Sequence, residues 1–189
     1  MNKGNLAIVL HAHLPYVRQE EPGSLEEDWF FQALIECYLP LLDTLKRSAK
    51  KKEEDPKITI GLSPTLLSLL EDQKLKKRFP KWISTRLELL KKVNNNQKES
   101  AEYLAEHFNK YLREWESFKG DLINQFSKLQ KAGVVDILTC AATHGYLPLL
   151  RENPEAVRAQ LKTAVREHKR LFKTSPLGIW LPECAYYEG

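Results

Sequence analysis

Short apolar runs that alternate with helical sequence are the feature that most constrains the fold of this chain. Four such runs occur in the 189 residues, at 6–11, 57–62, 134–139 and 177–181, and each precedes sequence with helical character. They are rich in β-branched residues, which is typical of strands covered on both faces. This alternation predicts an α/β fold with a parallel sheet or barrel and right-handed crossovers.

Helix start signals stand between the predicted strands. Ser24 and Glu27 have the spacing of a capping box ahead of the first helix, and Pro40 predicts a kink or a restart within it. Ser63 and Asn153 each precede a proline, the pattern of an N-cap followed by a first-turn proline.

A helical insertion is predicted between the second and third strands, at about residues 79–132. The amphipathic stretches 81–92 and 98–131 would form an antiparallel helical hairpin there. The sequence stops soon after the fourth predicted strand, and four strands cannot close a barrel. We therefore expect residues 1–189 to be a partial barrel domain whose last strand leaves an exposed edge.

The composition argues against several kinds of partner. Twenty-nine basic residues against 25 acidic ones give a net charge of +4, too small and too mixed to indicate nucleic-acid binding. The apolar run at the N-terminus is too short for a membrane span or a signal segment. The three cysteines, Cys37, Cys140 and Cys184, form no CxxC pair, which favours reduced thiols and a cytoplasmic location.

Ionisable side chains follow three of the four predicted strands, where parallel α/β folds bind ligands. We expect His11, His13, His144 and Glu183 to converge at one end of a sheet ordered by strands one to four. Glu183 follows an apolar run and a proline, so we expect it to be shielded from bulk solvent. It fits either a salt-bridged structural glutamate or one of the two carboxyl groups that glycoside hydrolysis requires.

The spacing of His11 and His13 leaves several interpretations open. On an extended strand end, residues two apart point to the same side. They could be one structural and one surface histidine, two metal ligands that lack a third, or neutral donors that hold sugar hydroxyls. Trp180 and Tyr186 offer rings on which sugars can stack, although aromatic residues at such positions are more often part of a core. Cys184 has no base placed for thiolate catalysis, so packing is its expected role.

Five segments resemble family 57 glycoside hydrolases. Residues 11–16, 60–64 and 180–186 resemble the first three signature segments of that family. Residues 143–148 and 26–31 resemble more particularly its branching-enzyme branch. The five segments occur in the family's order and span almost the whole chain.

The resemblance implies the N-terminal portion of an incomplete (β/α)7 barrel that acts on α-1,4-glucans without a metal or cofactor. It implies that Glu183 is the nucleophile of a retaining mechanism, followed either by transfer to a 6-hydroxyl, which makes a branch, or by hydrolysis. The substrate-binding residues it implies, with the aromatic residues named above, are His11, His13, His144, Trp180 and Tyr186.

The sequence departs from the family pattern in two places. The family's acid/base aspartate lies on a later strand, beyond Gly189, so we expect no activity on amylose from these residues alone. We also expect poor solubility, because the last strand has an unpaired edge and the barrel face is uncovered. Residues 18–22 lack the histidine-bearing loop expected of branching enzymes. One alternative is a metal-dependent carbohydrate deacetylase in which His11 and His13 bind zinc and His144 is a further ligand. Another is a non-catalytic truncated remnant.

Overall fold

The computed structural model describes residue 4, residues 6–50 and residues 57–188. These residues divide into two compact units, a sheet unit and a helical unit. The sheet unit contains the chain up to Tyr16, Leu45–Ser68 and the chain from Phe126 onward. The helical unit contains Val17–Thr44, which lies between the first and second strands, and Leu69–Gln125, which lies between the second and third and includes most of the predicted insertion. No helix in the described ranges is both long and apolar enough to cross a membrane.

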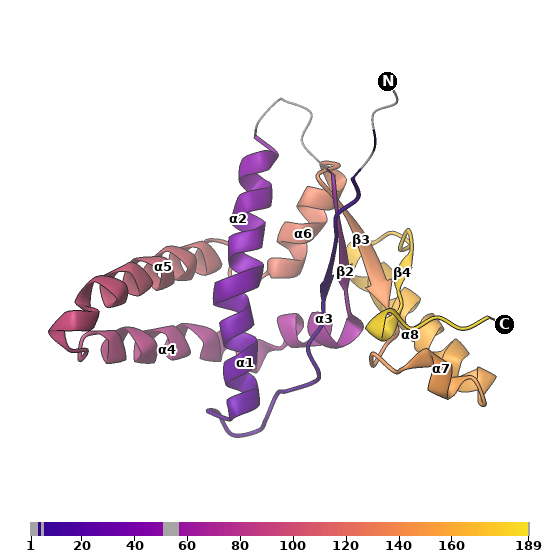
Figure 1. Ribbon diagram of the computed structural model, residues 1–189, viewed down its shortest axis with the longest axis horizontal. Coiled ribbons are helices and arrows are strands. Elements are labelled where there is room, and N and C mark those ends of the chain that lie inside the picture. The colour runs from indigo at the N-terminus through magenta and orange to yellow at the C-terminus, as the bar shows by residue number, and fades with distance from the viewer. Residues whose placement is uncertain (1–3, 5, 51–56, 189) are drawn as a thin grey trace. The chain divides into compact units, whose positions relative to one another are not determined.

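The sheet has four strands in the order β1-β2-β3-β4, and all neighbours pair in parallel (Figure 1). Their bounds are β1 Val9–Ala12, β2 Ile58–Leu62, β3 Val135–Cys140 and β4 Ile179–Trp180. The predicted strand order and parallel direction are therefore confirmed. The first and fourth strands are shorter than predicted, and the first and third end one residue later.

Burial differs between the inner and outer strands. Strands β2 and β3 are largely buried, whereas Val9 in β1 is 42% exposed and Ile179 in β4 is 37% exposed. The prediction that all four strands are covered on both faces is thus wrong for β1 and β4. These two strands stand at the edges of the described sheet, where each has a hydrogen-bonded neighbour on one side only.

Helices of the sheet unit start at the predicted caps. Helix α3 (Pro64–Glu71), whose first part belongs to this unit, follows Ser63, whose Oγ accepts the backbone N–H of Leu66 at 3.3 Å. Helix α7 (Leu147–Leu150) precedes α8 (Pro154–Phe172), where Asn153 Oδ1 accepts the N–H of Ala156 at 3.2 Å. Helix α8 packs on β3. It buries His168 to 1% exposure, with neither ring nitrogen hydrogen-bonded among the described residues.

The hydrogen bonding of the first helical segment changes locally just before Pro40. Helix α1 (Leu25–Ala33) runs directly into a π-helical turn (Leu34–Tyr38) and then into α2 (Leu39–Ser48). In the π turn the N–H of Leu39 donates to Leu34 O, which leaves Ile35 O free of its α-helical partner. His107 Nε2 donates to Ile35 O at 2.9 Å. The predicted disturbance by Pro40 therefore takes the form of a π turn that a distant histidine completes.

The predicted hairpin has different bounds and a break. Its first helix, α4 (Gln73–Leu90), starts well before residue 81, because Asp72 caps it by accepting the N–H groups of Lys74 and Leu75 at 2.8 and 2.9 Å. A short 3-10 turn (Asn95–Gln97) leads to α5 (Lys98–Ser117), which lies beside α4 (Figure 1).

A single helix over 98–131 is wrong, since α5 ends at Ser117 and α6 covers Leu122–Lys131. Lys119 and Gly120 both have positive φ at the break. A Cβ at Gly120 would lie 2.7 Å from the ring of Trp115, so a side chain larger than hydrogen does not fit there.

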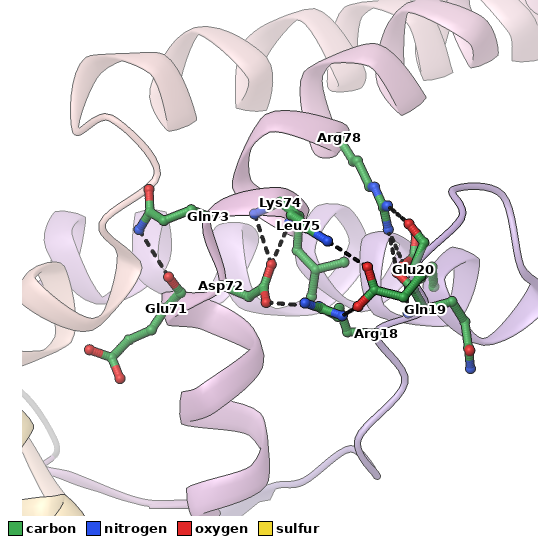
Figure 2. Close-up of polar contacts among 10 residues, drawn as sticks. Arg18, Gln19, Glu20, Glu71, Asp72, Gln73, Lys74, Leu75 and Arg78 are labelled. Carbon is green, nitrogen blue, oxygen red and sulfur yellow. Dashed lines mark hydrogen bonds and ion pairs between the residues drawn. The ribbon is translucent and has the colours of Figure 1, made fainter.

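Charged side chains hold the loop after Tyr16 on the start of α4, within the helical unit (Figure 2). Arg18 Nε donates to Asp72 Oδ2 at 3.2 Å and the Arg18 guanidinium also pairs with Glu20, which accepts from Lys74 Nζ at 2.6 Å. Hydrogen bonds from Lys74 and then Arg18 lower the pKa of Glu20 to about 2. Arg78 donates to two backbone carbonyls of the loop. The loop that departs from the expected histidine-bearing pattern thus has its own network of ion pairs.

Candidate active site

The structure brings His11, His13, His144 and Glu183 together at the carboxyl end of the sheet, all within the sheet unit. Nε2 of His11 lies 3.0 Å from Nε2 of His144, and the rings of His13 and His144 stack with centroids 3.8 Å apart and planes 9° apart. Oε1 of Glu183 lies 3.6 Å from Nδ1 of His144. The four residues that follow predicted strand ends therefore form one cluster.

The strand register explains how His11 reaches the cluster. His11 lies opposite Gly61, Gly61 lies opposite Leu138, and Cys140 lies opposite Trp180. Residues paired across a sheet, and residues two apart along a strand, point to the same face. A Cβ on Gly61 would lie 3.1 Å from His11 Nδ1 and 3.3 Å from Trp180 Cβ.

Because glycine has no side chain, Gly61 leaves room for the imidazole of His11 and the indole of Trp180, which stack with centroids 5.1 Å apart. Burial in this position, and then the proximity of His144, lowers the pKa of His11, while the carboxylate of Glu183 acts in the opposite direction.

Two hydroxyl groups hold His13, which follows β1. Its Nδ1 lies 2.9 Å from Ser63 Oγ and 3.1 Å from Thr65 Oγ1. Burial lowers the pKa of His13 to about 4, and the neighbouring imidazoles of His144 and His11 add to the effect because like charges disfavour protonation. His13 is therefore a neutral ring at physiological pH, with one nitrogen engaged by hydroxyls.

His144 and Glu183 stand on strained backbone. Both have positive φ, at 56° and 55°, and so does Cys184 beside Glu183. For residues with a Cβ this conformation costs free energy, and it is concentrated at functional sites. Glu183 lies in a 3-10 turn (Pro182–Cys184) directly after β4, and its backbone conformation sets the direction of its side chain.

The Glu183 side chain is 71% exposed, whereas that of His144 is 8% exposed. The expectation that this carboxylate is shielded from bulk solvent is wrong for the described residues, because the turn that carries it projects past the last strand. The same exposure argues against a buried structural salt bridge, and leaves the carboxylate open to an approaching ligand.

Comparison with known proteins identifies the family. Residues 7–189 match the family described as glycosyl hydrolase family 57. The chain belongs to that family. The sequence resemblance is thereby confirmed, as is the prediction of the N-terminal portion of its barrel.

Relatives of this family 57 chain include branching enzymes. A 1,4-alpha-glucan branching enzyme of Thermococcus kodakarensis is 38% identical over 187 residues, which are 97% of this chain and 27% of the relative. A probable 1,4-alpha-glucan branching enzyme of Mycobacterium tuberculosis is 26% identical over 98% of this chain and 38% of its own length. The chain thus spans about a quarter to two fifths of the length of these curated relatives.

Solved structures of similar proteins have the same fold. The alpha-amylase AmyC from Thermotoga maritima superposes with a TM-score of 0.89 at 36% identity, over 100% of this chain and 37% of that one. A GH57-type branching enzyme from Pyrococcus horikoshii superposes with a TM-score of 0.88 at 37% identity, over 97% of this chain and 35% of that one.

The two aromatic residues predicted for the site of this family 57 chain differ in position. Trp180 packs on His11 and belongs to the cluster, whereas Tyr186 is 76% exposed beyond the turn. Their roles in substrate binding stay predictions. Sequence reasoning missed the hydroxyls of Ser63 and Thr65 as partners of His13, although Ser63 was identified as a helix cap.

Cys140 is a further member of the site that sequence reasoning missed. It is fully buried at the end of β3, and burial raises the pKa of its thiol to about 11. One donor atom each from His11, Cys140 and His144 lie within 4.8 Å of one another, a geometry that could accept a metal ion. The sequence signal for Cys140 was the alternation along β3, because residues two apart on a strand point to the same face and Leu138 is on the face of His11. That the family 57 site works without a metal stays a prediction.

Proposed function

We propose that this chain carries the nucleophile-bearing part of a retaining active site for α-1,4-glucans, with Glu183 as the nucleophile. The observation that carries the proposal is the open carboxylate of Glu183, held on a strained turn 3.6 Å from the nearly buried His144. Family membership supports it, because glycoside hydrolysis with retention requires a carboxylate placed to attack the sugar.

In this mechanism Glu183 attacks the anomeric carbon while the leaving glucan oxygen takes a proton from an acid, and a glycosyl ester forms. The resemblance assigns the acid to an aspartate on a later strand. Water then regenerates Glu183 in hydrolysis, whereas a 6-hydroxyl of a second glucan chain does so in branching. In either case the same acid, now a base, accepts the proton of the attacking hydroxyl group.

Neutral histidines suit such a reaction. His11 and His13 have lowered pKa values and so carry no positive charge that would oppose the charge developing on the sugar ring. A neutral imidazole has one donor and one acceptor nitrogen, and the nitrogen of His13 that Ser63 and Thr65 do not engage can hydrogen-bond a sugar hydroxyl. We propose that His11, His13 and His144 line the subsite next to Glu183, with Trp180 as an apolar wall.

Of the two outcomes we propose branching rather than hydrolysis, as a step in making a glycogen-like glucan. The support is that two of the relatives described above are named as 1,4-alpha-glucan branching enzymes. We also propose a cytoplasmic location, supported by free thiols at Cys37, Cys140 and Cys184. The family match does not favour a metal-dependent deacetylase.

A fluorosugar α-glucosyl fluoride tests the nucleophile directly. Fluoride leaves without help from an acid, so a competent nucleophile forms a long-lived ester whether or not the acid/base is present. We expect intact-mass spectrometry to show one added fluorosugar, and peptide mapping to place it on Glu183.

Glu183→Gln should remove the adduct, while Glu188→Gln, a nearby exposed glutamate, should keep it. No adduct on the unmodified chain, or an adduct on the Glu183→Gln variant, would overturn the assignment.

A further inference from the structure

We propose that His11, Cys140 and His144 form an inhibitory binding site for Zn²⁺ and similar thiophilic divalent ions, overlapping the glucan site. Neither the mechanism above nor the family match uses the thiol of Cys140. The inhibitory consequence depends on the proposed function, whereas metal binding itself does not.

The strand register creates the donor set. Cys140 follows Leu138 by two residues on β3, and Leu138 pairs with Gly61, which pairs with His11. The Cys140 thiol and the His11 imidazole therefore point to the same face, with no side chain on Gly61 between them. The loop after β3 returns His144 to the same place, where its ring contacts that of His11 at a centroid distance of 5.2 Å.

The geometry is close to that of a tetrahedral zinc site. Zn–N bonds of about 2.0–2.1 Å and Zn–S bonds of about 2.3 Å place neighbouring donors roughly 3.3–3.6 Å apart. The two Nε2 atoms are 3.0 Å apart, and the donors of all three residues fall within 4.8 Å. A shift of about an ångström, which rotation of one side chain supplies, therefore completes a site with three ligands.

An unused nitrogen supports the assignment. Nδ1 of His11 is buried and has no hydrogen-bond partner among the described residues. Buried polar atoms without a partner are uncommon in folded proteins, and each one calls for an explanation. A metal ion bound to Nδ1 would satisfy this atom, whereas an ion held between the two Nε2 atoms would replace the hydrogen bond that joins them.

Binding converts the Cys140 thiol into a thiolate and releases its proton to solvent. The ion then occupies the face on which His11 and His144 are proposed to meet a sugar, next to Glu183. Its charge also draws the carboxylate of Glu183 toward it and away from an anomeric carbon. A fourth position remains for water or for that carboxylate. We therefore expect inhibition that competes with glucan.

Titration with Co²⁺ alone tests the site, because a thiolate ligand gives a sulfur-to-cobalt charge-transfer band that histidine and carboxylate ligands do not give. The reduced chain should develop this band, and Zn²⁺ should abolish it by displacement. Cys140→Ser and Cys140→Ala should both lack the band, with circular dichroism confirming that they fold. Cys184→Ser, which removes the exposed thiol beside Glu183, should keep it.

Loss of a residue that only hydrogen-bonds to a metal ligand weakens metal affinity roughly 10- to 100-fold. Because Cys140 is proposed as a ligand itself, calorimetry should show a larger loss of Zn²⁺ affinity in the Cys140 variants. Absence of the band in the unmodified chain, or its persistence in both Cys140 variants, would overturn the site. If the band forms but the fluorosugar does not label Glu183, the metal site stands and the proposed function fails. If Zn²⁺ binds but does not slow fluorosugar labelling, the inhibitory role fails.

Discussion

Gly61 and His11 lie opposite each other in the sheet, and Nδ1 of His11 is 3.1 Å from the point that a Cβ on Gly61 would occupy. Gly61→Ala should therefore push the His11 ring, and Trp180 on the other side, out of position. We expect a loss of about 1–3 kcal/mol in the free energy of unfolding, as for other overpacked cores. Urea unfolding followed by tryptophan fluorescence measures it.

Gly4→Ala is the matched control, because nothing lies within 4 Å of a Cβ there, and it should leave the midpoint unchanged. A Gly61→Ala variant as stable as the unmodified chain would show that the His11 ring has room to move.

Glu27 and Arg78 form an ion pair within the helical unit, with the Glu27 side chain 1% exposed. Glu27 Oε1 also accepts the N–H of Gln19 at 3.0 Å, while Oε2 has no partner among the described residues. Arg78→Leu leaves a buried carboxylate without its cation, which should cost about 3–5 kcal/mol. Denaturant unfolding measures the loss.

The double variant Glu27→Leu with Arg78→Leu should recover most of that stability, because it removes the uncompensated charge together with its partner. A double variant as unstable as Arg78→Leu alone would instead assign the cost to lost packing of the arginine stem and to its lost hydrogen bonds with the carbonyls of Gln19 and Glu20.

His168 on α8 is a buried histidine whose two ring nitrogens have no partner among the described residues, and burial lowers its pKa to about 4. Between 6.5 and about 4 the unfolded chain binds a proton that the folded chain does not, so stability falls as pH falls. This histidine should contribute a slope of up to about 1.4 kcal/mol per pH unit in that range.

His168→Leu should flatten that part of the pH profile and raise stability at neutral pH, since an apolar side chain of similar size leaves no unsatisfied group. His107→Leu is the contrasting variant, because His107 donates to Ile35 O and its loss should destabilise. An unchanged pH slope in His168→Leu would show that His168 already has a partner, such as a buried water.

The sequence predicted the parts of this fold that depend on local pattern. The parallel sheet and the cluster of His11, His144 and Glu183 follow from short apolar runs, three of which have ionisable side chains at their carboxyl ends. The helical apolar spacing did not predict the break between Ser117 and Leu122, because that spacing continues through it. The close approach of Trp115, which leaves no room for a Cβ on Gly120, is a contact that the spacing does not reveal.

Other features depend on contacts between distant residues. Cys140 enters the site through the register of β2 against β3, which neither strand specifies alone. Glu27 had the spacing of a reciprocal capping box, and Ser24 Oγ does accept its N–H at 3.1 Å. Its carboxylate instead pairs with Arg78, far away in sequence, because a buried charge is stabilised more by a cation than by a backbone N–H.

The protonation of His13 gives the last prediction. Ser63 Oγ accepts the N–H of Leu66, so its own proton is available for Nδ1 of His13 or for Thr65 Oγ1. A hydroxyl that donates to Nδ1 makes this nitrogen the acceptor and leaves the proton of the neutral ring on Nε2. His13 would then present an N–H donor to a sugar hydroxyl.

We expect long-range ¹H–¹⁵N spectra at neutral pH to show His13 protonated on Nε2 only. The ring should titrate with a midpoint near its pKa of about 4, well below 6.5. Stability linked to this ring is therefore present above 6.5 and is lost as pH falls toward about 4.

Ser63→Ala should raise the midpoint, because it removes the hydroxyl 2.9 Å from Nδ1, and a hydrogen bond to the neutral ring disfavours its protonation. Ser63→Thr retains the hydroxyl and should restore the original value. Ser63→Ala also removes a helix cap worth about 1 kcal/mol, so its titration is read only where circular dichroism shows a folded chain. A proton on Nδ1 at neutral pH would reverse the donor and acceptor roles of His13, and would leave its Nε2 able only to accept from the sugar.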